Sequence, residues 1–355
     1  MQKLRGGTDR DALRADGTTA AVIDASFTVE PGQIFVVMGL SGSGKSTLLR
    51  MLNGLLEPTS GQVLFDGEDL TALSPAQLRH VRSTKISMVF QHFALFPHRS
   101  VLENAAYGLE VQGVPRAERN RRATEALQLT GLAGWEKSWP DELSGGMQQR
   151  VGLARALATD ADLLLMDESF SALDPLIRRD MQDQLLELQK RLKKTIVFIT
   201  HDLNEAMRLG DRIAVMRDGE IVQLGTAEDI LVTPANDYVA SFTQDVDRTR
   251  VLTAGAVMAD TDTVMGTLCD KGTEIRSADD VLRATPATVT ESTPIIELFT
   301  PCSQSRVAVA VTDDQGKLLG VVPRERLLAV LGEPMTPASA PQDAAATSLK
   351  KVAGV

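Results

Sequence analysis

The sequence has few cysteines, few aromatic residues and no long apolar run. Cys269 and Cys302 are its only cysteines among 355 residues, so we expect neither a disulfide framework nor a cysteine-rich metal site. No stretch approaches the roughly 18 consecutive apolar residues that indicate a membrane-spanning helix. The opening MQKLRGGTDRDALRADG contains no apolar segment of the secretory type. These absences predict a protein of the reducing cytosol.

The chain also lacks an excess of basic residues. It carries 37 Lys and Arg against 47 Asp and Glu, a formal net charge of −10, which argues against a general nucleic-acid binder. Its 43% hydrophobic and 24% charged residues are ordinary for a globular protein. Because 355 residues exceed the usual size of one domain, we expect more than one.

One stretch, GLSGSGKS at 39–46, fits the phosphate-loop pattern G-x-x-x-x-G-K-[ST]. Its glycines let the backbone curl so that N–H groups point at phosphate oxygens. Lys45 can reach the β- and γ-phosphates, and the Ser46 hydroxyl can hold Mg²⁺. An apolar strand predicted at 34–38 and a helix beginning at 47 flank the loop, which disfavours a chance glycine turn. The predicted phosphate-binding residues are Gly39, Ser41, Gly42, Ser43, Gly44, Lys45, Ser46 and Thr47.

The rest of the first two thirds alternates predicted strands with predicted helices. Apolar strands are expected at 86–90, 163–167 and 195–199, mainly helices over 100–158, and a helix over 178–192. Such alternation predicts a mostly parallel α/β sheet, whose ligands bind at the carboxyl ends of the strands. Four polar side chains directly follow such strands, and we expect them beside the phosphate loop: Gln91, Asp167, Glu168 and His201.

Several motifs then follow in a fixed order. They are GLSGSGKS, Gln91 in VFQHFALFPH, LSGGMQQR at 143–150, LLLMDE at 163–168, SALD at 171–174 and His201. Over residues 22–240 the sequence therefore resembles the ATP-binding-cassette (ABC) ATPases. The resemblance implies a P-loop NTPase fold of the ABC type with a helical subdomain at about 92–158, and ATP and Mg²⁺ as cofactors.

The resemblance also implies a role for each polar residue at the strand ends. A lone carboxylate at a buried strand end is costly without a cation, so Asp167 is expected to bind Mg²⁺ together with Ser46 and Gln91. Glu168 is the candidate base that polarises the attacking water, which Gln91 is also expected to reach, and His201 is expected to contact the γ-phosphate. If each of these side chains were considered alone, an ordinary role in a helix cap, a loop or a turn would be the better interpretation. The order of the motifs favours catalytic and metal-binding roles instead. His80, His92 and His98 match no motif and are interpreted as surface or packing residues.

A second turn with bare amides precedes a predicted helix. Ser144, Gly145 and Gly146 lie at this turn, and Gln148 follows. On its own, the turn is equally a loop between helices. The family resemblance implies instead that these residues bind the γ-phosphate held by a second copy, in an ATP-sandwiched homodimer.

Three longer sequence segments indicate which group of ABC ATPases the chain resembles. MGLSGSGKSTLLRMLNGL, MVFQHFALFPHRSVLENAAYGLEVQG and MDESFSALDP are most similar to importers of betaine, proline betaine, choline and related quaternary amines. That implies transmembrane permease subunits, a periplasmic or extracellular substrate-binding protein, and a peripheral position at the cytoplasmic face of the membrane. An importer ATPase for another solute, such as amino acids, is the alternative. A soluble ABC protein of DNA repair or translation is disfavoured, because the chain is acidic and no long heptad insertion splits its single cassette.

The predicted organisation is a lead-in at 1–20, an ABC ATPase domain at 21–244, a small α/β domain at 245–332 and a disordered tail at 333–355. Residues 285–331 resemble one CBS (cystathionine β-synthase-like) repeat, and 251–284 are a candidate degenerate partner. Adenosine-binding repeats usually carry Ser or Thr and, three residues on, Asp after the second strand. Pro323 and Arg326 stand at these positions, which argues against adenosine binding there. A sensor of ligand or ionic strength and a dimer-stabilising appendage both remain open.

The sequence departs from the family pattern at the residue that would stack on the adenine base of ATP. Such ATPases often place Tyr or Trp upstream of the phosphate loop to stack on the base. Here the only aromatic residue before the loop's strand is Phe27, in a strand-like pattern that predicts core packing.

Overall fold

The computed structural model of the chain describes residues 17, 19–244, 246–264, 277–284, 288–304 and 308–332. The predicted tail at 333–355, and the predicted lead-in at 1–20 apart from residues 17, 19 and 20, lie outside the described residues. The chain divides into two compact units, one of Met1–Ile230 with Pro234–Asp247 and one of Leu231–Thr233 with Arg248–Val355. Each unit is described by itself.

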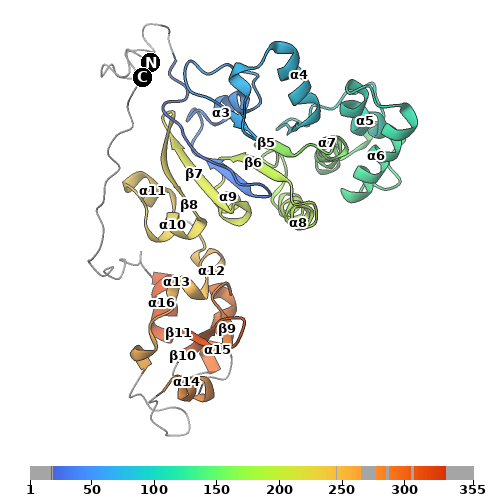
Figure 1. Cartoon of the computed structure of the whole chain (residues 1–355). Helices are drawn as coiled ribbons and strands as arrows, with labels where there is room; N and C mark the ends of the chain where they lie inside the picture. Colours follow the sequence, from blue (N-terminus) through green and yellow to red (C-terminus); the bar gives the residue numbers. More distant parts are fainter. Residues whose placement is uncertain are drawn as a thin grey trace. The chain divides into compact units, whose positions relative to one another are not determined.

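The first unit is built on a six-stranded sheet (Figure 1), whose strand order is β4-β5-β6-β1-β7-β8. The first five of these strands run parallel, and β8 pairs antiparallel with β7. The parallel α/β sheet expected from the sequence is therefore confirmed. The bounds are β1 Ile34–Met38, β4 Ile86–Val89, β5 Leu163–Asp167, β6 Thr195–Thr200, β7 Arg212–Arg217 and β8 Glu220–Gly225, with a separate small hairpin of β2 Leu64–Phe65 and β3 Glu68–Asp69.

Successive side chains of each strand point to opposite faces of the sheet, and helices cover both faces. On one face, Phe35 and Val37 of β1 join a core with Leu49 of α3 (Lys45–Leu52) and Val81 of α4 (Pro75–Thr84). Figure 1 shows α8 (Pro175–Leu192) and α9 (Leu203–Leu209) on the side opposite α3. The central strands are thus buried on both sides, as their continuous apolar runs require.

The helix α8 begins three residues before the predicted start at 178. Asp174 caps it, because its carboxylate accepts a hydrogen bond from the Ile177 N–H at 3.1 Å. Pro175 then occupies the first helical position, where a missing N–H costs nothing. The helical residues 175–177 thus begin directly after the SALD motif.

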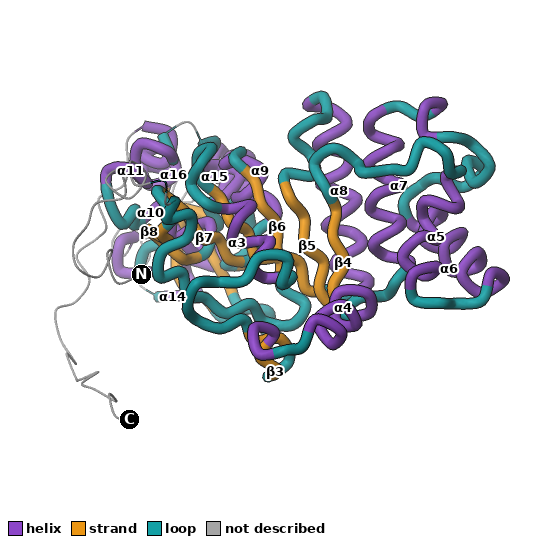
Figure 2. Tube along the Cα trace, turned by 90° about the horizontal axis from the view of Figure 1, so that it is seen from above, coloured by secondary structure: helices purple, strands orange, loops and turns teal. Residues whose placement is uncertain are grey.

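Three helices pack together beyond the edge strand β4 (Figure 2): α5 Val101–Val111, α6 Arg116–Leu129 and α7 Gly145–Ala158. Their shared core includes Leu109, Leu127 and Val151, each fully buried. A capping box of Ser100 and Glu103 fixes the start of α5. This helical group agrees with the mainly helical prediction for 100–158.

The second unit contains a three-stranded sheet of order β11-β10-β9. Strands β10 and β11 form an antiparallel hairpin, and β9 runs parallel to β10. Residues 308–311 are all buried. The elements here are α12 Arg248–Val251, α13 Ala254–Val257, α14 Ala278–Ala284, β9 Thr288–Thr290, α15 Ile295–Gln304, β10 Ala308–Thr312, β11 Leu318–Pro323 and α16 Arg324–Gly332; α10 Ala227–Val232 and α11 Asp237–Phe242 precede them.

Among the described residues, no helix combines the length and the apolar character needed to cross a membrane.

Candidate nucleotide site

The phosphate loop joins the end of β1 to the start of α3 and requires glycine at two positions. A Cβ on Gly39 would lie 2.2 Å from the Met216 carbonyl oxygen. A Cβ on Gly44 would lie 2.1 Å from the Ala21 carbonyl oxygen, and Gly44 has a φ of +103°. The loop therefore packs closely on neighbouring backbone at both ends. Over Gly42, by contrast, an added Cβ meets no atom within 4 Å, so this side of the loop is open.

Lys45 is buried at the start of α3, with only 4% of its surface exposed. Its Nζ donates hydrogen bonds to the carbonyl oxygens of Gly39 at 2.8 Å and Leu40 at 3.0 Å. Burial lowers the pKa of Lys45, while the nearby carboxylates of Glu168 and Asp167 oppose that shift. The ammonium is thus held inside the loop. The first N–H groups of α3 have no acceptor within the helix, so ammonium and amides together suit an anion.

Ser46 and Asp167 bring a hydroxyl and a carboxylate together from different elements. The Ser46 hydroxyl on α3 donates to Asp167 Oδ1 at the end of β5, at 3.0 Å. Burial raises the pKa of Asp167, and the bond from Ser46 partly opposes the rise. A half-buried carboxylate beside a hydroxyl is a donor set that Mg²⁺ accepts when nucleotide oxygens complete its shell. These residues fit the predicted metal.

Glu168 and His201 meet at the ends of neighbouring strands. Asp167 of β5 pairs with Ile199 of β6, so the residues that follow the two strands lie close together. His201 Nδ1 lies 3.0 Å from Glu168 Oε2. Glu168 has a φ of 44°, a left-handed conformation that is unusual for a residue with a side chain. Its side chain is 19% exposed and that of His201 is 52% exposed, so both remain open to a ligand or water.

Gln91 reaches the same region through Ser171. The Gln91 side-chain amide donates to the Ser171 hydroxyl at 3.1 Å, and that hydroxyl donates to the Glu168 carbonyl oxygen at 2.8 Å. The structure therefore links Gln91 to the loop that carries Glu168. Ser171 was not predicted as a site residue, although it begins the SALD motif; only this contact identifies it.

The second predicted anion turn starts α7. Ser144 caps the helix, and its hydroxyl oxygen accepts a hydrogen bond from the Met147 N–H at 3.4 Å. Gly146 is buried where a Cβ would lie 2.5 Å from Ile177 Cγ2. The Gln148 side-chain amide donates to the carbonyl oxygens of Pro140 at 2.8 Å and Leu143 at 3.2 Å, which fixes the loop before the turn. Contact of Ser144, Gly145, Gly146 and Gln148 with a second copy's nucleotide stays a prediction.

The residues predicted to lie at the surface or to pack in the core are found in those places. His80, His92 and His98 are exposed. The Phe27 ring stacks on Phe35 of β1, with ring centroids 4.7 Å apart and an interplanar angle of 11°. Phe27 packs against the main core, which confirms the packing role predicted for it.

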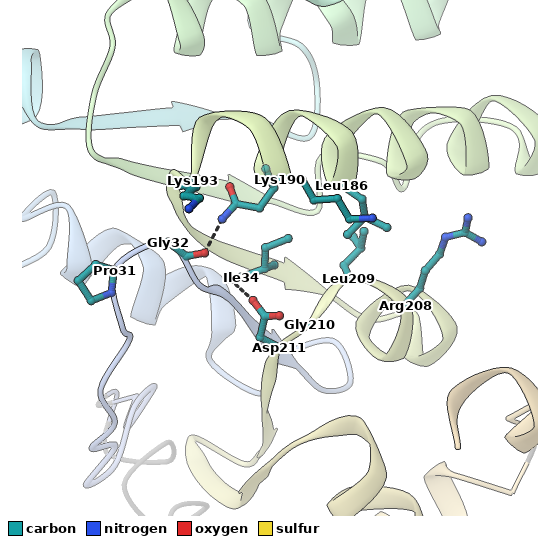
Figure 3. Close-up of a pocket in the computed structure, with 11 residues that line it drawn as sticks. Pro31, Gly32, Ile34, Leu186, Lys190, Lys193, Arg208, Leu209, Gly210 and Asp211 are labelled. Carbon is teal, nitrogen blue, oxygen red and sulfur yellow. Dashed lines mark hydrogen bonds between the residues drawn. The ribbon is translucent and has the colours of Figure 1, made fainter. Parts of the chain in front are cut away.

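A hollow of about 650 Å³ lies at the other end of the sheet (Figure 3). Its lining includes Ile34, the first residue of β1, whereas the phosphate loop follows the last residue of that strand. Two hydrogen bonds fix its wall: the Gln189 side-chain amide donates to the Gly32 carbonyl oxygen at 2.6 Å, and the Ile34 N–H donates to Asp211 Oδ2 at 2.8 Å. This hollow is separate from the predicted nucleotide site.

In the second unit, Arg326 stands where adenosine-binding CBS repeats usually carry the ribose-binding Asp. One of its Nη atoms donates to the Met258 carbonyl oxygen at 2.8 Å. The side chain therefore ties α16 to the backbone after α13.

Comparisons with known proteins agree with this geometry. The family described as ABC transporter matches residues 22–171, and the family described as CBS domain matches residues 278–333. The chain is thus an ATP-binding ABC cassette with a C-terminal CBS domain. The CBS match includes α14, so it begins earlier than the repeat predicted from residue 285.

Relatives of this chain match it over nearly its whole length. The glycine betaine transport ATP-binding protein OpuAA of Bacillus subtilis is 50% identical over 370 residues, covering 93% of this chain and 88% of that protein. The glycine betaine/proline betaine transport system ATP-binding protein ProV of Escherichia coli is 45% identical over 366 residues, covering 92% of each. The chain belongs to this family of ABC-transporter ATP-binding proteins, and it is an ATPase.

A solved relative shows the same fold. The bacterial ABC transporter cassette MJ0796 matches with a TM-score of 0.54 and 36% identity, covering 58% of this chain and 90% of that one. One of its structures is described as dimeric, and another as a dimeric post-hydrolysis state bound to ADP and Pi.

Proposed function

We propose that this chain hydrolyses ATP to energise a membrane importer of quaternary amines such as glycine betaine, proline betaine or choline. The observation that carries the proposal is the extent of the similarity. Identity of 45–50% continues through 92–93% of the chain, so it includes the CBS domain as well as the cassette. A likeness confined to the cassette would indicate only an ABC ATPase.

The proposed chemistry uses positioned charges. Lys45 and the N–H groups of the phosphate loop bind the phosphates. Ser46, Asp167 and Gln91 would hold Mg²⁺, which would supply positive charge to the phosphate oxygens. Glu168 orients and polarises the attacking water. His201 contacts the γ-phosphate, while its Nδ1 contacts the Glu168 carboxylate. Phosphoryl transfer needs mainly positioning and charge neutralisation, and these side chains supply both.

The proposed assembly is a homodimer with ATP between the two cassettes. The turn from Ser144 to Gly146 and Gln148 completes the site of the other copy. The dimeric MJ0796 structures support this arrangement. The proposed partners are transmembrane permease subunits and a periplasmic or extracellular substrate-binding protein, so the chain would act as a peripheral protein at the cytoplasmic face of the membrane. No nucleic-acid partner is proposed.

Uptake measurements test the function. The gene is disrupted in its host, and uptake of radiolabelled glycine betaine and of a radiolabelled amino acid is measured at high osmolarity. We expect betaine uptake to fall and amino-acid uptake to persist, with recovery by the wild-type chain and not by Glu168→Gln. Loss of amino-acid uptake with normal betaine uptake would instead support the alternative solute class.

A further inference from the structure

Arg178, on the first turn of α8, contacts two loops that carry the site. One of its Nη atoms lies 3.2 Å from Asp202 Oδ2, and the other donates to the carbonyl oxygens of Ser171 at 3.3 Å and Leu173 at 3.1 Å. The two side chains of the ion pair are only 26% and 32% exposed. Because guanidinium is planar and presents several donors in a fixed fork, one side chain can hold a carboxylate and two carbonyls together.

The first of these loops carries His201. Asp202 follows His201 directly, and its other oxygen, Oδ1, accepts from the Glu205 N–H at 3.2 Å and so caps α9. The Asp202 N–H donates to the Thr200 hydroxyl oxygen at 2.9 Å. His201 therefore lies between two residues whose side chains are both fixed, and Arg178 holds one of them.

The second loop carries Glu168. The Ser171 hydroxyl donates to the Glu168 carbonyl oxygen at 2.8 Å, while Arg178 holds the carbonyl of Ser171 itself. His201 Nδ1 lies 3.0 Å from Glu168 Oε2. The contacts form a closed ring that runs from Glu168 through Ser171, Arg178, Asp202 and His201 back to Glu168.

We infer that Arg178 is a positioning residue for hydrolysis, which sets the distance between His201 and Glu168 by clasping the loops that carry them. This inference rests on the proposed roles of Glu168 and His201. Arg178 itself touches neither reacting group. Its loss lets the two loops separate, and small displacements of catalytic groups reduce rate strongly.

Steady-state ATPase kinetics of the full-length chain test this inference. We expect Arg178→Gln to lower kcat about tenfold, with KM for Mg-ATP and the melting temperature nearly unchanged. Arg178→Lys keeps the charge toward Asp202 without the fork, so it should recover part of the rate. The matched control is Arg179→Gln, because Arg179 is the exposed neighbour on the same helix and its loss should leave kcat unchanged.

A double-mutant cycle isolates the ion pair. Asp202→Asn retains an oxygen to cap α9 but removes the charge that Arg178 clasps, so this variant keeps the test valid if Arg178→Gln folds poorly. We expect it to lower kcat also, and the double variant to be no slower than the slower single variant. Unchanged kcat in Arg178→Gln, or additive losses in the double variant, would overturn the inference.

The variant Glu168→Gln distinguishes a failure of the proposed hydrolytic chemistry from a failure of the positioning role of Arg178. If it abolishes hydrolysis while Arg178→Gln does not affect it, the proposed function stands and the positioning role of Arg178 is wrong. If Glu168→Gln turns over normally, the proposed chemistry itself fails, whatever Arg178 does.

Discussion

Replacing Lys45 with alanine removes the one ammonium group that the phosphate loop encloses. In the free protein its Nζ donates to two loop carbonyls, at 2.8 Å and 3.0 Å. In the proposed site, that buried cation contacts phosphate oxygens when ATP binds, and a hydrogen bond to a charged group contributes roughly 1.5–3 kcal/mol. Since 1.36 kcal/mol is a factor of ten, Lys45→Ala should weaken ATP affinity roughly 10- to 150-fold.

Isothermal titration with ATP and Mg²⁺ measures this effect. Lys85→Ala is the control, because Lys85 is 52% exposed and pairs on the surface with Asp162 at 3.0 Å. Lys85 precedes the first residue of β4, whereas the site lies where the parallel strands end, so this variant should bind ATP like the wild type. Equal affinities for Lys45→Ala and the wild type would refute the assignment of the phosphate site.

Three further predictions concern packing and buried charge. Gly44→Ala should fold less stably, because its Cβ would meet the Ala21 carbonyl at 2.1 Å with a φ of +103°; thermal unfolding measures the loss. Phe27→Ala should lower stability by about 1–3 kcal/mol in urea unfolding through lost packing on Phe35, without changing ATP affinity. Burial raises the pKa of Glu205 in the folded state, so the folded state retains its proton to higher pH than the unfolded state does. Wild-type stability should therefore fall as pH rises from the ordinary glutamate range through the raised pKa, and urea unfolding of Glu205→Gln should lack that slope.

Each of these three predictions would be contradicted by a specific result. A Gly44→Ala protein as stable as the wild type would mean that the loop does not pack as described. Weaker ATP binding by Phe27→Ala, with stability preserved, would assign the ring to adenine. Parallel pH profiles for Glu205→Gln and the wild type would show that burial does not perturb this carboxyl.

The sequence allowed the place of the proposed catalytic side chains to be predicted, because strand ends can be recognised from apolar runs. Asp167 and Glu168 end one such run and His201 follows another, and parallel topology brings the ends of neighbouring strands together. The 3.0 Å contact between Glu168 and His201 follows from that arrangement. The order of the motifs supplied the proposed roles of these residues, which the strand pattern alone does not indicate.

The supporting contacts were not predictable in this way. Arg178 lies in a run of charged residues, LIRRDMQDQ, which reads as a solvent-facing stretch of helix. Its partner Asp202 is 24 residues away, and only the fold brings them together. The sequence prediction starts α8 at residue 178, whereas the cap at Asp174 starts the helix at Pro175. Contacts between distant loops depend on tertiary geometry, whereas the cap at Asp174 is a local contact that the Asp-Pro pair in the sequence already signals.

The most direct measurement of the central claim is ATP turnover and oligomeric state of Glu168→Gln. Amidation retains the size of the side chain but removes the base, so the variant should bind ATP, hydrolyse it very slowly and accumulate as an ATP-bound dimer in light scattering. Glu187→Gln, an exposed glutamate on α8, is the matched control and should turn over normally. Near-normal hydrolysis by Glu168→Gln would contradict the account.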